Sequence, residues 1–337
     1  MPPQNLLINL NIKLIIADGD FDGLVAAAVL KTAWPKAFVI FSHPSEIRSG
    51  EYDDLINSNT AICDLPFHEN CGLYIDHHAT NRPTKKQEEE FTEKGGHIHW
   101  EKADSAARVA YDLFRPLFDL SALEPVMDMV DRLDGGRITK EEFLSDDEII
   151  WISRTVTSSD QQYTTKLLNQ LVEGKSIGEI AKDQDVSARI KMKKENMKEI
   201  QSILDSKSNV ENRLVICELQ NTEFRTNGYL VTAHYGNDCD ACIIIHGQEK
   251  DENGNCTLSA SFYSNSFLHT EGGVFDLSKL ATMFDPFGGG HRNACGCRIV
   301  PLDHNLSIEN RTANADDVIT HLSAWKRAWD KSQSNKH

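Results

Sequence analysis

Carboxylates follow the first apolar run of the chain at alternate positions. The segment Asp18-Gly-Asp20-Phe-Asp22-Gly23 comes directly after the run at residues 13–17. In an extended segment alternate side chains point the same way, so we expect these three carboxylates to converge. Convergent carboxylates repel one another unless a cation holds them, and oxygen ligands suit Mg²⁺ or Mn²⁺. The spacing therefore predicts a divalent metal site at the end of the first strand.

The same segment also matches the beginning of a calcium-binding EF-hand loop, with Gly23 at the sixth position. That loop needs a bidentate Glu at its twelfth position, where this chain has Val29. It also needs a preceding helix, whereas the run at residues 13–17 indicates a buried strand. The sequence therefore argues against an EF-hand.

Two later apolar runs also end in Asp. Asp64 ends the run that begins at Thr60, and Asp76 ends the run that begins at Gly72. His77 and His78 follow Asp76 directly, and imidazole is a ligand for Mn, Zn and Fe. An Asp-His-His triplet beside two other acidic strand ends is poorly explained as ordinary structural histidine. These residues extend the predicted metal site.

The elements that must position these residues alternate between strands and helices. Apolar runs at residues 13–17, 38–41, 60–63 and 72–75 indicate strands, and residues 24–30, 104–114 and 122–133 indicate helices. We expect Asp104 to cap the second of these helices. Alternating strands and helices predict an α/β fold whose mostly parallel sheet gathers ligands at the carboxyl ends of its strands.

The pattern of predicted helices and strands changes twice after this region. Residues 151–208 are predicted to form a helical linker, and residues 209–330 to form a smaller C-terminal α/β domain, after a catalytic domain at residues 1–150. The length of 337 residues suits two domains, each with its own core.

Charge narrows the range of functions. The net charge is −16, from 35 Lys and Arg against 51 Asp and Glu. A protein that follows long nucleic acid normally carries a basic face, so we expect no long nucleic acid as partner. A small phosphate-bearing molecule, met through metal ions, remains compatible with this charge. No run approaches a membrane span and the N-terminus does not read as a signal peptide, so we expect a cytoplasmic protein.

The eight cysteines allow one alternative interpretation. Cys239 and Cys242, together with Cys295 and Cys297, have spacings that a four-thiolate zinc site could use. Such a site would make the chain a zinc-stabilised interaction domain. Cys242 and Cys297 border apolar runs typical of strands, so we favour reduced thiols that pack as small hydrophobic side chains.

At these acidic strand ends the chain resembles the DHH phosphoesterases, a family that includes nanoRNase-type oligoribonucleases and RecJ exonucleases. Its name-giving triplet is Asp76-His77-His78. Its first motif, His-x-Asp-x-Asp-Gly, is matched from Asp18 to Gly23, with Asp18 in the place of the His. The remaining motifs are matched by Asp64, by Asp134 after a helix, and by Gly288-Gly289-Gly290-His291 followed by Arg292.

The resemblance implies a hydrolase with two divalent ions, usually Mn²⁺ with Mg²⁺ as the alternative. It implies Asp18, Asp20 and Asp64 as ligands of one ion. It implies Asp22, Asp64, His77 and Asp134 as ligands of the other ion. Asp76 would orient His77, and His78 would face the scissile phosphate, which makes Asp76 and His78 the expected catalytic pair. Gly288, Gly289, Gly290, His291 and Arg292 would bind the substrate, and a homodimer is compatible with the family.

The function expected from the resemblance is a phosphodiesterase that releases nucleoside monophosphates from short oligonucleotides or linear dinucleotides. The same scaffold also serves bisphosphate nucleotide phosphatases, cyclic-dinucleotide phosphodiesterases, and pyrophosphate or polyphosphate hydrolases. Asp18 in place of His leaves another class open, a nucleotide-binding regulator with a weakened metal site. Such a regulator should hold fewer than two ions.

Overall fold

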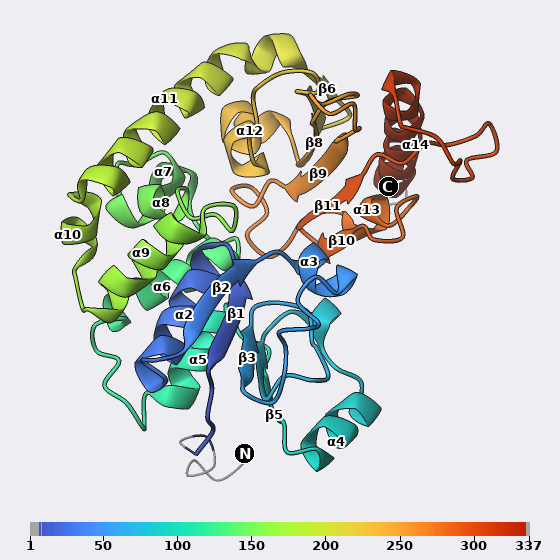
Figure 1. The fold of residues 1–337 in the computed structure, drawn as a ribbon. Helices are drawn as coiled ribbons and strands as arrows, with labels where there is room; N and C mark the ends of the chain where they lie inside the picture. The colour runs from blue at the N-terminus through green and yellow to red at the C-terminus, as the bar shows by residue number, and fades with distance from the viewer. Residues whose placement is uncertain (1–6, 8, 335–337) are drawn as a thin grey trace. The chain divides into compact units, whose positions relative to one another are not determined.

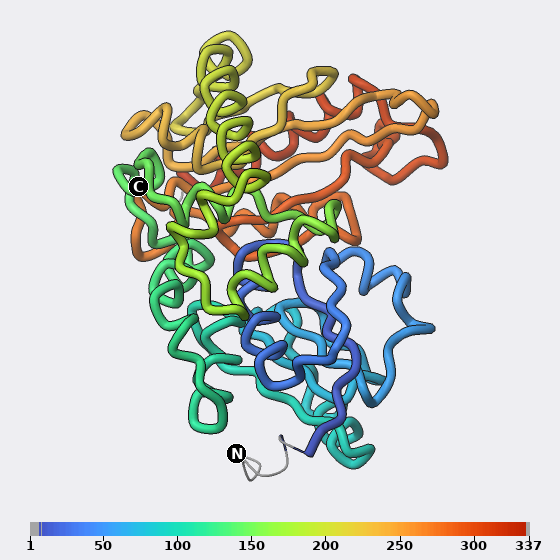
Figure 2. The backbone as a smooth tube through the Cα atoms, turned by 60° about the vertical axis from the view of Figure 1, so that its left-hand side comes forward, coloured from blue at the N-terminus to red at the C-terminus, as the bar shows by residue number. Residues whose placement is uncertain are grey.

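The computed structural model describes residue 7 and residues 9–334, which divide into two compact units. Unit 1 comprises the chain up to Gly136 together with Ser145–Lys193, and unit 2 comprises Arg137–Leu144 together with the chain from Lys194 onward. The last passage of the chain from unit 1 to unit 2 lies within one continuous helix, α11 (Gln184–Lys207), which can be followed in the ribbon and in the backbone tube (Figure 1, Figure 2).

Unit 1 is built on a five-stranded parallel sheet in the order β2-β1-β3-β4-β5. The parallel sheet and the α/β class confirm the prediction. Its strands are β1 (Leu14–Asp18), β2 (Phe38–Ser42), β3 (Thr60–Cys63), β4 (Leu73–Asp76) and β5 (His97–Trp100). The last strand was not expected, because His-Ile-His-Trp contains no apolar run.

Helices cover the sheet and connect its strands. They are α2 (Phe21–Ala33), α3 (Pro44–Ser49), α4 (Lys85–Glu93), α5 (Ala106–Phe114), α6 (Glu124–Asp134), α8 (Glu148–Ser153), α9 (Gln161–Val172) and α10 (Ile177–Ala181), with a short 3₁₀ turn η1 (Ala79–Asn81). The predicted cap of α5 is wrong by one residue: the Ser105 side chain, not that of Asp104, accepts a hydrogen bond from the Arg108 amide at 3.0 Å.

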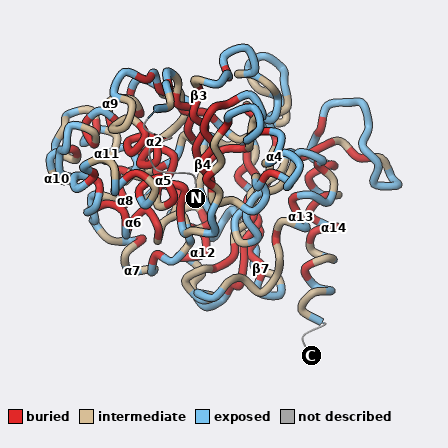
Figure 3. The backbone as a smooth tube through the Cα atoms, turned by 90° about the horizontal axis from the view of Figure 1, so that it is seen from below, coloured by how far each residue is buried: buried red, intermediate tan, exposed pale blue. Residues whose placement is uncertain are grey.

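The two faces of the sheet bury different side chains, as the alternation of strand residues requires. Ile15 and Ala17 belong to the core that includes α2, α5, α6 and α9, whereas Ile16 belongs to a smaller core on the other face. Figure 3 shows α2 and α5 as largely buried elements, and residues 21–30 of α2 are buried throughout. The Ala-rich sequence of α2 therefore suits a helix enclosed between the sheet and other helices.

Unit 2 contains a mixed six-stranded sheet in the order β10-β11-β9-β8-β7-β6, in which only β7 and β8 pair in parallel. Its strands are β6 (Ser208–Glu211), β7 (Leu214–Glu218), β8 (Ala241–His246), β9 (Ser259–Ser264), β10 (Gly289–His291) and β11 (Ala294–Arg298). Its remaining helices are α7 (Lys140–Phe143), α12 (Gly228–Tyr235), η2 (Gly236–Asp238), α13 (Ser278–Ala281) and α14 (Ala315–Ser334). The α/β character predicted for the C-terminal region is confirmed.

Among residues 7 and 9–334, the structure contains no helix with both the length and the apolar character needed to cross a membrane.

A substitution at Gly23, in the first turn of α2, tests how tightly the backbone packs at the junction between β1 and α2. A Cβ atom at this position would lie 2.2 Å from the carbonyl oxygen of Asp18, so a side chain cannot fit without moving the backbone. We expect Gly23→Ala to lower the free energy of unfolding by about 2 kcal/mol, although alanine is the better helix former. Chemical denaturation in the presence of a chelator measures this change.

Gly178→Ala in α10 is the matched control, because its Cβ would meet only the flexible side chain of Glu148, at 3.2 Å. We expect this control to be neutral or stabilising. Equal stability changes in the two variants would contradict the assignment of Gly23 to a backbone constraint.

Candidate metal centre

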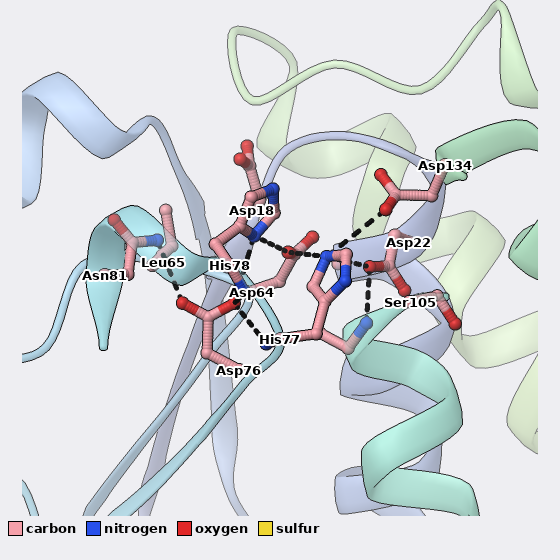
Figure 4. Close-up of polar contacts among 12 residues, drawn as sticks. Asp18, Asp22, Asp64, Leu65, Asp76, His77, His78, Asn81, Ser105 and Asp134 are labelled. Atoms are coloured by element: carbon pink, nitrogen blue, oxygen red, sulfur yellow. Dashed lines mark hydrogen bonds and ion pairs between the residues drawn. The ribbon is translucent and has the colours of Figure 1, made fainter. Parts of the chain in front are cut away.

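The acidic residues that the sequence singled out meet at the carboxyl edge of the parallel sheet (Figure 4). Asp18 ends β1, Asp76 ends β4, and Asp64 directly follows β3. Because β1, β3 and β4 are parallel neighbours, their carboxyl ends lie at one edge. This arrangement places ligand atoms from distant parts of the chain within reach of one another.

Asp18, Asp20 and Asp64 form one group, in which one ligand atom from each lies within 4.8 Å of the others. The Asp18 carboxylate accepts a hydrogen bond from the Gly19 amide at 2.6 Å. Asp20 caps α2 by accepting from the Gly23 amide at 2.9 Å. All three candidate ligands of this group therefore offer carboxylate oxygens, although the family resemblance leads us to expect a histidine at position 18.

Asp22, His77 and Asp134 form a second group, in which one ligand atom from each also lies within 4.8 Å of the others. The expectation that Asp18, Asp20 and Asp22 converge along one extended segment is wrong. The chain turns into α2 at Phe21, so Asp22 lies in the first helical turn and points to a different place.

The N-terminus of α5 holds Asp22. Both of its oxygens accept backbone hydrogen bonds at 2.7 Å, from Ala106 and from Ala107. The amides at a helix N-terminus favour negative charge, so they stabilise this buried carboxylate. The groups that contain Asp18 and Asp22 thus depend on separate local turns, and a third group joins Asp64 to Asp76, His77 and His78.

Asp64 lies at the centre of the site and adopts an unusual backbone conformation. Its φ angle is +59°, a left-handed value that Asp tolerates better than most residues. Its amide donates to the carbonyl of Ile75 at 3.0 Å. This conformation fixes the direction in which the carboxylate leaves the end of β3.

Three buried polar atoms at this centre have no hydrogen-bond partner: both carboxylate oxygens of Asp64 and Nε2 of His77. The Nε2 atom lies 3.2 Å from Asp134, 3.8 Å from Asp22 and 3.9 Å from Asp64, without hydrogen-bond geometry to any of them. Buried polar groups are normally paired, and unpaired ones need an explanation. Divalent cations bound among these oxygen and nitrogen donors would supply the missing partners.

The two histidines have different partners, which corrects one expectation. The ring of His77 is fixed by a contact of 3.1 Å between Nδ1 and the carbonyl of Ala103, so that Nε2 faces the carboxylates. Asp76 does not hold that ring; it contacts Nδ1 of His78 at 3.0 Å and accepts from the backbone amides of both histidines. A carbonyl partner at Nδ1 leaves Nε2 as the ligand nitrogen of a neutral imidazole.

Two residues that the sequence reasoning missed complete the surroundings of Asp76. The Tyr74 hydroxyl lies 2.8 Å from its Oδ2 atom, and the Asn81 side-chain amide donates to the same atom at 2.9 Å. A tyrosine two positions before Asp76 in an otherwise aliphatic strand was a signal, because alternate strand residues share a face.

Burial and mutual repulsion dominate the electrostatics of the carboxylates. Burial, followed by the charge of Asp20, raises the pKa of Asp22 to about 7. Burial and neighbouring carboxylates likewise raise the pKa values of Asp18, Asp64 and Asp134 well above the usual range. Without a cation, the folded protein therefore concentrates groups that resist ionisation.

Asp76 and His78 behave in the opposite way. Burial opposes ionisation of Asp76, but the hydrogen bond and charge of His78 prevail and lower its pKa. Burial also disfavours protonated His78, but the hydrogen bond that His78 donates to Asp76 prevails and raises the pKa of His78. Burial, together with His78, lowers the pKa of His77. The site thus separates an anionic Asp76 with a proton-holding His78 from a neutral His77.

The glycine-rich motif lies in unit 2, where Gly289 to His291 form β10 rather than an irregular loop. A Cβ at Gly288 would lie 2.1 Å from the Ala281 carbonyl oxygen, and one at Gly290 would lie 2.9 Å from that of Ala294. Close approach of the neighbouring backbone therefore explains why these two positions are glycine. At Gly289 nothing lies within 4 Å of a Cβ, which leaves its backbone open to a ligand.

The cysteines do not gather into a metal site in the described part of the chain. The groups of possible metal ligands found there contain only Asp and His. Cys242 lies in β8, and Cys295 and Cys297 lie in β11. The four-thiolate alternative therefore has no geometric support among residues 7 and 9–334.

The raised pKa values predict how stability depends on pH and metal. Asp22 has a pKa of about 7 in the folded chain against an ordinary value of 3.8, so the folded state binds more protons between these values. The metal-free protein should therefore lose stability as pH rises through this window. Added Mn²⁺ should raise the midpoint of thermal unfolding by about 5–10 °C at pH 8 and less at pH 5.5, because protons compete for the carboxylates.

Asp64→Asn separates this effect from general ion binding. In chelator at pH 8 the variant should unfold at a higher temperature than the parent, since one repelling charge is gone, and most of the Mn²⁺ shift should disappear. An undiminished Mn²⁺ shift in this variant would contradict the site. Thermal unfolding followed by circular dichroism is the measurement.

Comparison with known proteins locates this architecture among solved structures. No protein-family model matches the sequence, and no curated protein matches it. Among solved structures, a pGpG-specific phosphodiesterase, PggH from Vibrio cholerae, is similar with a TM-score of 0.63 at 22% identity. The match covers 94% of this chain and 99% of that one.

Weaker similarity extends to RecJ exonucleases. One RecJ structure bound to manganese matches with a TM-score of 0.49 at 12% identity, covering 88% of this chain and 89% of that one. RecJ from Thermus thermophilus in complex with Mn²⁺ matches with a TM-score of 0.48 at 13% identity, covering 88% and 52%. The match to PggH carries the assignment of fold. The chain has the DHH phosphoesterase fold that its motifs predict.

Proposed function

We propose that this chain is a metal-dependent phosphodiesterase that hydrolyses short oligonucleotides or linear dinucleotides to nucleoside monophosphates. One observation carries the proposal: Asp64 belongs to one group of ligand atoms and lies 3.9 Å from His77 of the other, and its two buried oxygens have no hydrogen-bond partner. A pair of divalent cations sharing a carboxylate suits hydrolysis of phosphate esters. A purely structural acidic cluster would not need a buried carboxylate without hydrogen bonds between its halves.

In this proposal Asp18, Asp20 and Asp64 hold one ion. Asp22, Asp64, His77 and Asp134 hold the other, with Mn²⁺ as the expected metal and Mg²⁺ as the alternative. Two such ions lower the pKa of a water molecule and stabilise the charge that develops on the phosphoryl oxygens. The group formed by Asp18, Asp20 and Asp64 favours an active site over a regulator that has lost one ion, because a third carboxylate stands where the family usually has histidine.

His78 is the catalytic side chain in contact with the substrate. Its side chain is 31% exposed, whereas that of Asp76 is fully buried. Asp76 keeps Nδ1 occupied, so Nε2 remains to donate a hydrogen bond or a proton to a phosphate oxygen. Tyr74 and Asn81 hold Asp76 in place through its other oxygen, and the buried carboxylate supports the protonated imidazole.

The substrate class is proposed from charge and from the similar fold. A chain with a net charge of −16 suits a small anion met through cations better than a long polyanion. PggH, which shares the fold, is named for action on pGpG, a linear dinucleotide. We further propose that Gly288, Gly289, Gly290, His291 and Arg292 bind the part of the substrate that does not react, with the open backbone at Gly289 as the contact.

Hydrolysis of a 5′-phosphorylated dinucleotide with added Mn²⁺ tests the function directly. The parent protein should release mononucleotides. Asp64→Asn should lower kcat by about a thousandfold or more, because it removes a donor common to both ions. Asp76→Ala should lower kcat by about a hundredfold, because His78 loses its orienting partner. Product release is followed by chromatography.

Asp128→Asn is the matched control, since Asp128 lies on α6 like Asp134 but is an exposed partner of Arg132. It should retain the activity of the parent, whereas Asp134→Asn should not. A folded parent protein that turns over no dinucleotide with excess Mn²⁺ would show that the substrate belongs to another class of phosphate ester or anhydride.

A further inference from the structure

Two arginines beside the candidate metal centre have no acidic partner. Arg48 in α3 and Arg82 after η1 are exposed, and neither forms an ion pair with any residue of the described chain. Four other arginines of unit 1 pair with carboxylates: Arg108 with Asp131, Arg115 with Asp112, Arg132 with Asp128, and Arg189 with Asp160 and Asp185. In a strongly acidic protein, two unpaired guanidinium groups at one place need an explanation.

Arg82 is held on an aromatic surface rather than left mobile. Its guanidinium carbon lies 4.3 Å from the centre of the Trp100 ring, a distance at which cation and ring attract each other. Trp100 ends β5, in register with Asp76 at the carboxyl end of β4. Its indole NH donates to the His78 carbonyl at 2.9 Å. The stacked pair is therefore anchored to the backbone of the proposed catalytic residue.

Arg48, which precedes the Asp-His-His triplet in the chain, contacts the segment that follows the triplet. Its guanidinium donates to the side-chain oxygen of Asn81 at 3.3 Å, and Asn81 in turn donates to Asp76. Asn81 and Arg82 are adjacent in the chain. One guanidinium is thus bound to Asn81, and the other belongs to the next residue, Arg82. Both lie at the segment that follows the Asp-His-His triplet, within unit 1.

We propose that Arg82, stacked on Trp100, and Arg48 bind a terminal phosphomonoester of the substrate. This inference rests on the proposed function and narrows its substrate to short oligonucleotides that carry a phosphate at one end. A terminal phosphate has a charge of about −1.5 to −2 at pH 7, more than a phosphodiester, and arginine binds it bidentately. The Trp100 ring lies against the guanidinium carbon of Arg82, which leaves N–H groups of Arg82 to donate to a ligand.

The preorganised geometry gives a physical reason for selectivity. A free arginine loses side-chain entropy when it binds, whereas Arg82 is already ordered by Trp100, and this lowers the entropic cost of binding. An internal phosphodiester lacks the additional charge that two guanidinium groups would neutralise. The site therefore favours a substrate end over the middle of a strand, in keeping with short substrates.

The test compares dinucleotides with one phosphodiester bond that carry a 5′-phosphate, a 3′-phosphate or no terminal phosphate. The parent should prefer one phosphorylated form, and which form it prefers tells which end of the substrate binds. In Arg82→Ala the ratio of kcat/KM for that form to kcat/KM for the unphosphorylated form should fall about tenfold to hundredfold, as expected for loss of a charged hydrogen bond. Arg82→Lys should lie between, because it keeps the charge and loses the planar fork.

Arg115→Ala is the matched control, since it removes an exposed arginine of unit 1 that already pairs with Asp112. It should leave the preference ratio of the parent unchanged. An Arg82→Ala variant that loses activity equally on all three dinucleotides, or a parent without preference, would overturn the proposal while leaving the phosphodiesterase function intact.

A binding measurement tests the inference even if the protein hydrolyses none of the dinucleotides. The probes are dinucleotides with an uncharged, non-hydrolysable methylphosphonate linkage, with and without the terminal phosphate, titrated by calorimetry. The terminal phosphate should tighten binding to the parent and contribute about tenfold less in Arg82→Ala. If no dinucleotide is hydrolysed, the proposed function fails, and equal binding of the two probes to the parent would overturn the phosphate site as well.

Discussion

Repulsion among buried carboxylates at the carboxyl edge of a parallel sheet governs unit 1. Asp18, Asp22, Asp64 and Asp134 all have raised pKa values there because water is excluded and like charges are close. Such a cluster destabilises the fold that builds it unless cations bind. The fold offsets part of this cost with oriented dipoles, as at Asp22, where two amides of α5 donate to the carboxylate. The left-handed backbone of Asp64 adds a further local cost at the same edge of the sheet.

The two adjacent histidines illustrate how small differences in partners separate chemical roles. His77 and His78 are neighbours with ring centres 4.2 Å apart, yet one contacts a carbonyl and the other a carboxylate. A carbonyl favours neutral imidazole with a free ring nitrogen, whereas a buried carboxylate favours imidazolium. Consecutive residues therefore supply the proposed ligand and the proposed proton donor. The network of Tyr74 and Asn81 around Asp76 stabilises this division by fixing the carboxylate that makes the difference.

Positive charge is arranged as selectively as negative charge. Four arginines elsewhere in unit 1 pair with carboxylates, whereas Arg48 and Arg82 are held by neutral partners, an amide and an indole. A neutral partner orders a guanidinium without cancelling its charge, so the group stays available to an anionic ligand. Beside a cluster of carboxylates, such cations give an acidic protein a local attraction for phosphate that its net charge does not provide.

The α/β class, the parallel sheet and the gathering of acidic strand ends were predictable from local pattern, because short apolar runs ending in Asp define strands and place their ends at one edge. The division of the candidate ligands into groups depends on long-range contacts and on the local turn at Phe21. A turn into α2 at Phe21 separates Asp22 from Asp18 and Asp20, and pattern along an extended segment could not show this. The partner of His77 is Ala103, distant in sequence and contacted through its backbone, which side-chain identity cannot reveal. Likewise β5 lacks an apolar run, so the position of Trp100 beside His78 follows from strand pairing alone, a long-range contact that no local pattern records.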